Sequence, residues 1–258
     1  MRTALTIAGS DSGGGAGIQA DLKTFAAHGV FGTSALTAVT AQNTRGVFAV
    51  HALTPELVAA QIDAVMSDLP PHAVKIGMLA NAAIAAVVAA RLRALAVVPV
   101  VLDTVMIAKG GASLLEADAV GTIRRELIPL AAVVTPNVPE AEALTGVSIR
   151  STAGLHEAAA RLVADGARAA VVKGGHLDGP AIDVLYDGQT FTELRADRVT
   201  TRHTHGTGCT FSSAIAARLA LGDDLLSAVR AAKHYITRAI AQAPELGGGH
   251  GPVQHFPK

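Results

Sequence analysis

The chain has 258 residues and a mass of 26.1 kDa, a size that a single α/β domain can reach. Basic and acidic residues number 21 each, and no basic run stands out, so the charges favour neither nucleic acid nor an anionic membrane surface as a partner. Half of the residues are hydrophobic but only 3% are aromatic, which predicts a core of Ala, Val, Leu and Ile, as in buried parallel strands covered by helices.

The predicted location is the cytoplasm. A single cysteine excludes an internal disulfide and fits a reducing compartment. The segment before Asp11 is too short for a secretory signal, and the apolar run over residues 82–90 is too short to span a membrane. Because the balanced charges favour neither nucleic acid nor a membrane surface, a small molecule is the expected partner.

The chain begins with a predicted strand, a glycine loop and a helix. Residues 5–8 predict a short buried strand, and apolar residues recur at helical spacing from Ile18. The loop between them, residues 9–17, matches neither G-x-G-x-x-G nor G-x-x-x-x-G-K-[ST], so it does not indicate a dinucleotide fold or a P-loop. Glycines this close together indicate that a ligand approaches the backbone, and a flexible connector is the alternative.

A second strand is predicted over residues 35–40, and Gln42 follows its carboxyl end. Ligands of α/β folds bind at that edge of the sheet. A primary amide donates and accepts hydrogen bonds side by side, which is the pattern that recognises an aminated nitrogen heterocycle. Gln42 is therefore a candidate ligand-binding residue. The alternative is that it only caps the loop.

Helices and strands alternate through the middle of the chain, over residues 55–66, 74–79, 81–95 and 98–103. The last of these strands ends in a carboxylate, Asp103. The apolar residues between Asp103 and the glycine pair 110–111 suggest a movable wall for a flat ligand.

The next two strands also end in residues that carry chemistry. A strand over residues 132–135 leads to Asn137, and Glu140 follows three positions later. This spacing is close to a capping box, whereas a functional interpretation has Glu140 organise a Mg²⁺ ion or its waters, because hard cations take oxygen ligands. A strand over residues 169–173 ends in Lys173, ahead of two glycines.

The segment after the predicted hairpin at 182–194 is a tight glycine turn that runs into an alanine-rich helix. Gly206 and Gly208 let consecutive N–H groups point at one spot, where the helix start adds its positive dipole end, so the turn predicts an anion site. Cys209 stands at this helix start, where a thiolate is favoured over a thiol. The alternatives are an ordinary loop end capped by Thr207 and a buried apolar cysteine.

A last helix is predicted from about residue 223 to residue 241. The alternation of strand and helix, without a composition break or an internal repeat, favours one mostly parallel sheet covered on both faces. The polar and glycine residues that follow the strands should then gather along one edge. His203 and His205 lack the spacing of a metal site and are interpreted as loop residues.

Taken together, the ordered motifs closely resemble the hydroxymethylpyrimidine/phosphomethylpyrimidine kinases of thiamine biosynthesis, in the ribokinase-like superfamily. The segments that carry the resemblance are residues 4–23, 41–44, 75–78, 101–106, 135–137, 173–176 and 205–210. The resemblance implies a three-layer α/β/α sandwich, a single kinase domain over residues 1–258, and usually a homodimer. It also implies that MgATP is used twice, first on the hydroxyl of 4-amino-5-hydroxymethyl-2-methylpyrimidine and then on the resulting monophosphate.

Site residues follow from the resemblance position by position. It implies that Gln42 holds the aminopyrimidine edge, with a pocket around the ring formed by Gly9, Asp21, Met78 and Val105. It implies that the nucleotide phosphates and Mg²⁺ are served by Asn137, Glu140 and Lys173, with Glu140 and Asp103 as the metal ligands.

The resemblance also assigns roles around the glycine turn. The anion hole, which also holds the nucleotide phosphates, would consist of Gly206, Thr207, Gly208 and Cys209, with Lys173 beside it. Cys209 would be the catalytic base of the first phosphorylation, at a position where related sugar kinases have Asp. The second phosphorylation needs no base, because a phosphate monoester is already anionic at neutral pH.

Two alternatives remain open from the sequence. A pyridoxine or pyridoxal kinase on the same scaffold would bind a similar flat heterocycle with a hydroxymethyl group. A protein that binds the pyrimidine without turning it over is an alternative of a different class.

Overall fold

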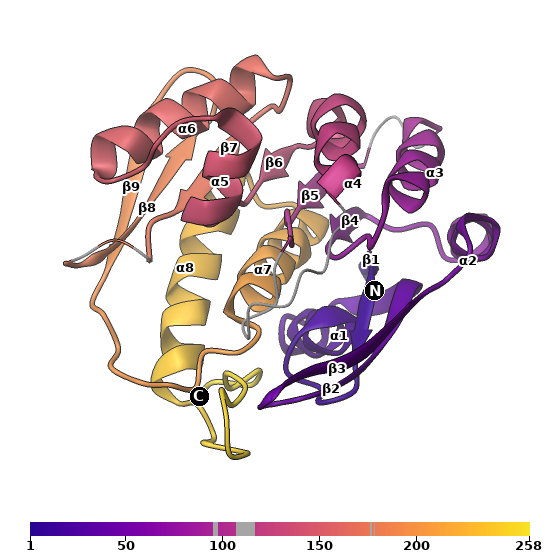
Figure 1. The fold of residues 1–258 in the computed structure, drawn as a ribbon, viewed down its shortest axis with the longest axis horizontal. Helices are drawn as coiled ribbons and strands as arrows, with labels where there is room; N and C mark the ends of the chain where they lie inside the picture. The colour runs from indigo at the N-terminus through magenta and orange to yellow at the C-terminus, as the bar shows by residue number, and fades with distance from the viewer. Residues whose placement is uncertain (95–97, 107–116, 176, 178) are drawn as a thin grey trace.

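One nine-stranded sheet runs through the computed structural model, which describes residues 1–94, 98–106, 117–175, 177 and 179–258 (Figure 1). The strand order is β3-β2-β1-β4-β5-β6-β7-β8-β9. The six strands β2-β1-β4-β5-β6-β7 run parallel to one another, whereas β3 at one edge and β8 and β9 at the other pair antiparallel. The strand bounds are β1 (Thr3–Asp11), β2 (Phe31–Asn43), β3 (Gly46–Ala52), β4 (Ala73–Ile76), β5 (Val100–Leu102), β6 (Val133–Val134), β7 (Ala170–Lys173), β8 (Ala181–Tyr186) and β9 (Phe191–Ala196).

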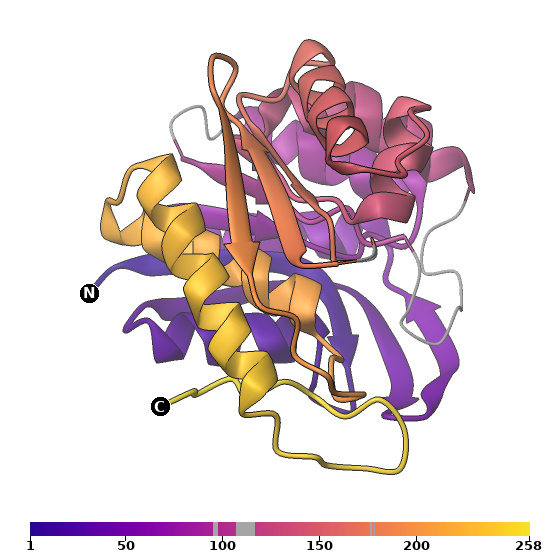
Figure 2. The same ribbon diagram turned by 90° about the vertical axis from the view of Figure 1, so that its left-hand side faces the viewer.

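Helices cover both faces of the sheet, and Figure 2 shows α8 on one side with α5 and α6 on the other. One layer contains α1 (Gly17–Ala27), α7 (Thr207–Leu221) and α8 (Leu225–Ala241). The opposite layer contains α2 (Pro55–Asp68), α3 (Ala82–Arg93), α4 (Ala117–Thr122), the π-helical turn η1 (Ile123–Leu127), the short helix η2 (Ile128–Leu130), α5 (Val138–Thr145) and α6 (Thr152–Ala164). The predicted three-layer α/β/α sandwich is confirmed.

Two hydrophobic cores, one on each face of the sheet, hold the layers together. Neighbouring residues of a strand point to opposite faces, so in β5 Val100 and Leu102 pack into the core under α2 to α6 while Val101 packs into the core under α1, α7 and α8. Both faces of the central strands are therefore apolar, which explains the unbroken Ala, Val, Leu and Ile runs of the sequence.

The structure corrects several element boundaries. β1 and β2 extend beyond the predicted residues 5–8 and 35–40, and the edge strand β3 and the helix α6 were missed. The apolar positions of β3 face solvent, so the strand lacks the pattern of a buried one: Phe48 is 69% and Val50 45% exposed. The glycine pair 110–111 and His176 lie outside the described residues. Within the described part of the chain, no helix is both long and apolar enough to cross a bilayer.

The C-terminal tail returns to the carboxyl edge of the sheet. The His250 amide donates to the Thr44 carbonyl beyond β2, and Pro252 forms a bridge with His205 just before α7. The tail thereby ties the loop after β2 to the glycine turn, at the edge where the parallel strands end.

Candidate active site

A cavity of about 890 Å³ opens along the carboxyl ends of the parallel strands and reaches from Gln42 to the start of α7 and on to α8. Ligands of α/β folds bind at this edge because the loops after the strands meet there. The structure brings together in the cavity wall almost all of the sequence-predicted site residues, namely Gly9, Gln42, Met78, Asp103, Val105, Asn137, Glu140, Lys173, Gly206, Thr207, Gly208 and Cys209.

The Gln42 end of the cavity combines apolar and polar side chains. Met78 is 7% exposed, and its Sδ would lie 3.0 Å from a Cβ atom on Gly9, so glycine at this position makes room for the methionine. Val105 contributes a second apolar surface. Gln42 sits at a register shift of the β2–β3 pair and is half-buried, with its amide beside the cavity. This combination fits a flat ring with one polar edge.

Asp21 is placed differently from the expectation. Its side chain is fully buried and does not line the cavity. Its carboxylate accepts hydrogen bonds from Thr6 (2.6 Å), Ser213 (2.7 Å) and Lys75 (3.0 Å). Of these three donors Lys75 lines the cavity, and the sequence analysis did not single it out. A lysine inside the apolar strand β4 was the signal that could have found it, since lysine is almost never fully buried without a partner.

Acidic and basic side chains alternate along the cavity wall and just behind it. The Lys75 ammonium is 3.0 Å from Asp21 and 4.0 Å from Asp103, and the Lys173 ammonium is 3.3 Å from the other oxygen of Asp103. Burial alone would lower the pKa of Lys75, but the carboxylates of Asp21 and Asp103 outweigh it and raise the pKa. The pKa of Lys173 is raised in the same way by Asp103 and Glu140 against burial. Both ammonium groups are therefore charged at neutral pH.

Glu140 is held by the local structure that the sequence indicated. Asn137 and Glu140 form a capping box at the start of α5, in which Glu140 Oε2 accepts the Asn137 amide (2.9 Å) and the Thr104 hydroxyl (3.2 Å). Burial raises the pKa of the Glu140 carboxyl, and the nearby Lys173 charge opposes that rise. The capping interaction is therefore real, and the Glu140 carboxyl group still lines the cavity.

The donor set around Asp103 fits a Mg²⁺ ion that is held partly by phosphate. Asp103 Oδ2 is buried and finds no hydrogen-bond partner among the described residues, and the Glu140 carboxyl lines the same cavity. Within the described ranges, no three His, Cys, Asp or Glu side chains come together to hold a metal ion. Mg²⁺ typically binds through one or two carboxylates, with phosphate and water completing its shell, so this arrangement suits it.

The start of α7 forms the predicted glycine turn, except that the Thr207 amide is already hydrogen-bonded within the turn. Gly206 has φ 81°, a left-handed conformation that favours glycine, and a Cβ atom there would lie 1.8 Å from the Gly15 carbonyl oxygen. The Thr207 amide and hydroxyl both donate to the Thr204 carbonyl (3.3 and 2.8 Å). Thr207 thus closes the turn, and among the described residues no acceptor binds the amides of Gly208 and Cys209, which are left for an anion.

The thiol of Cys209 is less acidic than its position at a helix start suggested. Desolvation by burial raises its pKa to about 12, and the charges of Asp103 and Asp21 add to this rise, while Lys75 and a hydrogen bond from the Gly17 amide oppose it. The prediction of a resident thiolate was therefore wrong, because the helix dipole is a smaller effect than the loss of water and two nearby carboxylates.

Sequence reasoning also missed the far arm of the cavity. This arm runs between the segment after β9 and the helix α8, where Val199, Ile236 and Ile240 offer apolar walls next to Thr201 and Thr237. Its residues come from elements with no motif, so only their assembly in space reveals them.

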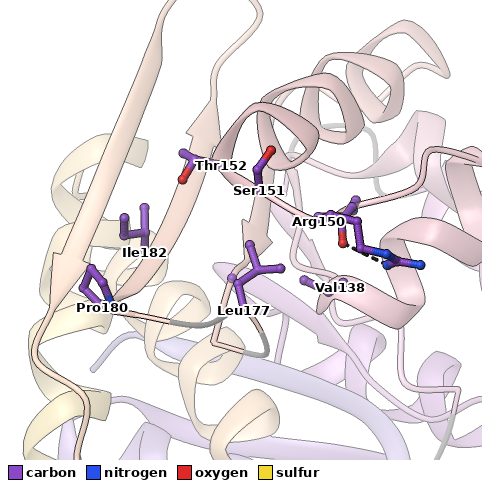
Figure 3. Close-up of a pocket in the computed structure, with 9 residues that line it drawn as sticks. Val138, Arg150, Ser151, Thr152, Leu177, Pro180 and Ile182 are labelled. Atoms are coloured by element: carbon purple, nitrogen blue, oxygen red, sulfur yellow. Dashed lines mark hydrogen bonds between the residues drawn. The ribbon is translucent and has the colours of Figure 1, made fainter.

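A second hollow of about 460 Å³ lies between the start of α6 and β8, where Figure 3 shows Ser151 and Thr152 opposite Ile182 and Pro180. Arg150 at its rim is 77% exposed and pairs with Glu142. Of the described residues that line this hollow, none is a predicted site residue. The large cavity is therefore the candidate active site.

Comparison with known proteins gives the family. The profile of the phosphomethylpyrimidine kinase family matches residues 11–254. The chain belongs to that family. It is 52% identical to the hydroxymethylpyrimidine/phosphomethylpyrimidine kinase of Haemophilus influenzae, over 99% of this chain and 97% of that one. It is 54% identical to a thiamine biosynthesis bifunctional protein of Geobacter sulfurreducens, and here the chain spans 98% of its own length but only 52% of the relative.

A solved structure of a pyridoxal kinase has the same fold as this chain. The ADP complex of Bacillus subtilis pyridoxal kinase superposes with a TM-score of 0.92 at 40% identity, covering 99% of this chain and 97% of that one. This likeness places the chain among phosphotransferases of the ribokinase-like fold.

Proposed function

We propose that the chain phosphorylates 4-amino-5-hydroxymethyl-2-methylpyrimidine with ATP and then phosphorylates the monophosphate to the diphosphate, in thiamine biosynthesis. The observation that carries the proposal is the continuous cavity, which joins the Gln42 amide to the Lys173 ammonium and to the amides of Gly208 and Cys209, for which the described part of the chain provides no acceptor. Such a cavity holds an amine-bearing ring at one end and transferring phosphate at the other. Family membership supports the same reaction.

The charges near α7 suit the transfer step. Phosphoryl transfer depends on positioning and on donors aimed at the migrating charge. A Cβ atom on Gly208 would lie 3.3 Å from Lys173 Nζ, so this ammonium lies beside the first turn of α7. In the first step the small thiolate fraction of Cys209, formed when the thiol releases its proton to solvent, takes the proton of the substrate hydroxyl and becomes a thiol again, while the hydroxyl oxygen attacks phosphorus and ADP leaves. In the second step the substrate phosphate is already anionic and needs no base.

The nucleotide occupies the remaining length of the cavity in this proposal. Its phosphates lie between Asn137, Lys173 and the start of α7, and its base lies in the arm beside Val199 and α8. Asp103 and Glu140 would hold Mg²⁺, which neutralises phosphate charge when it is bound.

The direct test is turnover of purified protein with each substrate. We expect ADP formation with the hydroxymethylpyrimidine and again with its monophosphate. Pyridoxal is the second candidate substrate, because the structure is so similar to a pyridoxal kinase, and we expect a lower kcat/KM for it. A protein that binds the pyrimidine without forming ADP would contradict the proposal.

Replacement of Gln42 by leucine tests the ring end of the cavity. The Gln42→Leu variant removes a paired donor and acceptor but keeps the side-chain size, so we expect the KM for the pyrimidine to rise about 10- to 100-fold. The KM for ATP should change little. Steady-state kinetics with each substrate varied in turn gives both values, and an unchanged pyrimidine KM would remove Gln42 from the pocket.

We also propose that residues 1–258 form one kinase domain that acts in the cytoplasm as a homodimer. The continuous sheet supports a single domain. The lone cysteine, which has no partner for an internal disulfide, supports a reducing compartment such as the cytoplasm.

The β2–β3 edge supports the dimer, because Val39 (45%), Phe48 (69%) and Val50 (45%) are exposed there, as at a protein contact. Light scattering should give twice the chain mass, and Phe48→Glu should shift the protein to a monomer. A monomeric wild-type protein would contradict this assembly.

A further inference from the structure

The carboxylate of Asp11 connects the glycine loop after β1 to the residue before the glycine turn. Asp11 Oδ2 accepts the amide of Ala16 (2.8 Å) and lies 2.8 Å from Nε2 of His205, while Oδ1 accepts the amide of Gly13 (2.8 Å). Burial alone would raise the pKa of Asp11, but the hydrogen bonds from His205, Ala16 and Gly13 outweigh burial and lower it. Asp11 is therefore an anion.

This contact fixes the hydrogen on one nitrogen of His205. A bare Nε2 would point a lone pair at an ionised carboxylate 2.8 Å away, so Nε2 carries a hydrogen and donates it to Asp11. The histidine backbone is also held, because its amide donates to the Gly251 carbonyl (3.0 Å) and its carbonyl accepts the Val253 amide (3.2 Å). The ring is thus held in place with a hydrogen on Nε2.

Gln42 touches the same nitrogen. One terminal atom of its amide lies 3.4 Å from His205 Nε2, and the other lies 3.1 Å from Thr40 Oγ1. The Thr40 hydroxyl donates to the Ser10 carbonyl (2.8 Å), so it can offer the amide only a lone pair. The single hydrogen on His205 Nε2 is already donated to Asp11, and it can be shared only with a second acceptor, never with the N–H of an amide. The amide oxygen therefore belongs on the His205 side and the amide nitrogen on the Thr40 side, since the hydrogen-bond network decides such assignments.

We propose that His205 is a specificity-determining positioning residue, which holds the Gln42 amide in one orientation toward the ring of the substrate. The inference rests on the proposed function. A 4-aminopyrimidine offers an N–H donor beside a ring-nitrogen acceptor, whereas the 4-oxo ring offers a carbonyl beside an N–H. An amide that could turn over would bind both rings equally well. An amide held by His205 and Thr40 binds the amino ring and meets the oxo ring with like groups.

The test measures a ratio of two substrates. The ratio of kcat/KM for the 4-amino ring to that for the same ring with a 4-oxo group should be large in the wild-type protein. We expect it to fall about tenfold or more in His205→Ala, because each paired base-edge contact carries a discrimination of this order. General damage to the site lowers both values and leaves the ratio unchanged, and an unchanged ratio overturns the proposal.

Three further variants complete the experiment. In a Gln42→Ala background, the additional change His205→Ala should leave the ratio where it is, because His205 acts through the amide; a further fall would contradict the proposal. Thr40→Val frees the other end of the amide and should also lower the ratio. This variant tests whether the amide is held in one orientation if His205→Ala does not fold. The matched control is His250→Ala, which changes an exposed histidine of the C-terminal tail outside the cavity wall and should keep the wild-type ratio.

The result is separable from a failure of the proposed function. A wild-type protein that phosphorylates neither ring contradicts the kinase assignment itself. A wild-type protein that phosphorylates the amino ring, with the same ratio in His205→Ala and Thr40→Val, contradicts only the role of His205.

Discussion

Replacement of Cys209 by alanine is expected to slow the first phosphorylation about 10²- to 10⁴-fold, the range that general-base catalysis contributes. The reason is that the substrate hydroxyl must lose its proton in this step, and Cys209 lines the cavity at the start of α7, beside the free amides. The second phosphorylation should slow far less, because its nucleophile is a phosphate oxygen that already carries charge. Single-turnover rates with each purified intermediate give the two effects separately.

The protonation of the thiol supplies a control on this result. Its pKa is about 12, so below that value the thiolate fraction rises tenfold with each pH unit. The first step of the wild-type protein should therefore accelerate from pH 7 to pH 9, and the Cys209→Ala variant should lose this dependence. Cys209→Ser preserves the shape of the site with a weaker acid and should resemble alanine. Equal losses in both phosphorylations would show that Cys209 supports the site without acting as its base.

Replacement of Lys75 by methionine should lower the free energy of unfolding by about 3–5 kcal/mol, the usual cost of removing one partner of a buried ion pair. Lys75 and Asp21 are both fully buried, with 3.0 Å between their charged atoms, so the variant leaves Asp21 as an uncompensated buried carboxylate. Urea denaturation followed by circular dichroism measures the loss.

Two further variants separate charge from packing. Arg91→Met breaks the pair with Asp63, whose side chains are 39% and 54% exposed, and it should cost no more than about 1 kcal/mol. Adding Asp21→Asn to Lys75→Met removes the stranded charge and should recover part of the stability. If Lys75→Met costs no more than Arg91→Met, Lys75 is not ionised in the folded protein.

The outline of the site could be predicted from the sequence because it depends on local patterns. A glycine turn that enters a helix, a carboxylate or lysine that ends an apolar strand, and an Asn–Glu capping box are each visible within a few residues. Parallel strands then bring such ends to one edge of the sheet, and this is where the structure places Gln42, Asp103 and Lys173. The family resemblance depended on the order of these same motifs and was confirmed.

The tertiary structure alone decided the partners and protonation states. Asp11 meets His205 across 194 positions of the chain, and Asp21 meets Lys75 across 54, so no local pattern announces either pair. The same holds for Cys209. Its position at a helix start predicted a thiolate, but burial and two carboxylates that are distant in sequence and close in space keep the thiol protonated. Backbone conformation follows from neighbours in sequence, whereas the ionisation of a side chain depends on the water and charge around it, which only the folded chain fixes.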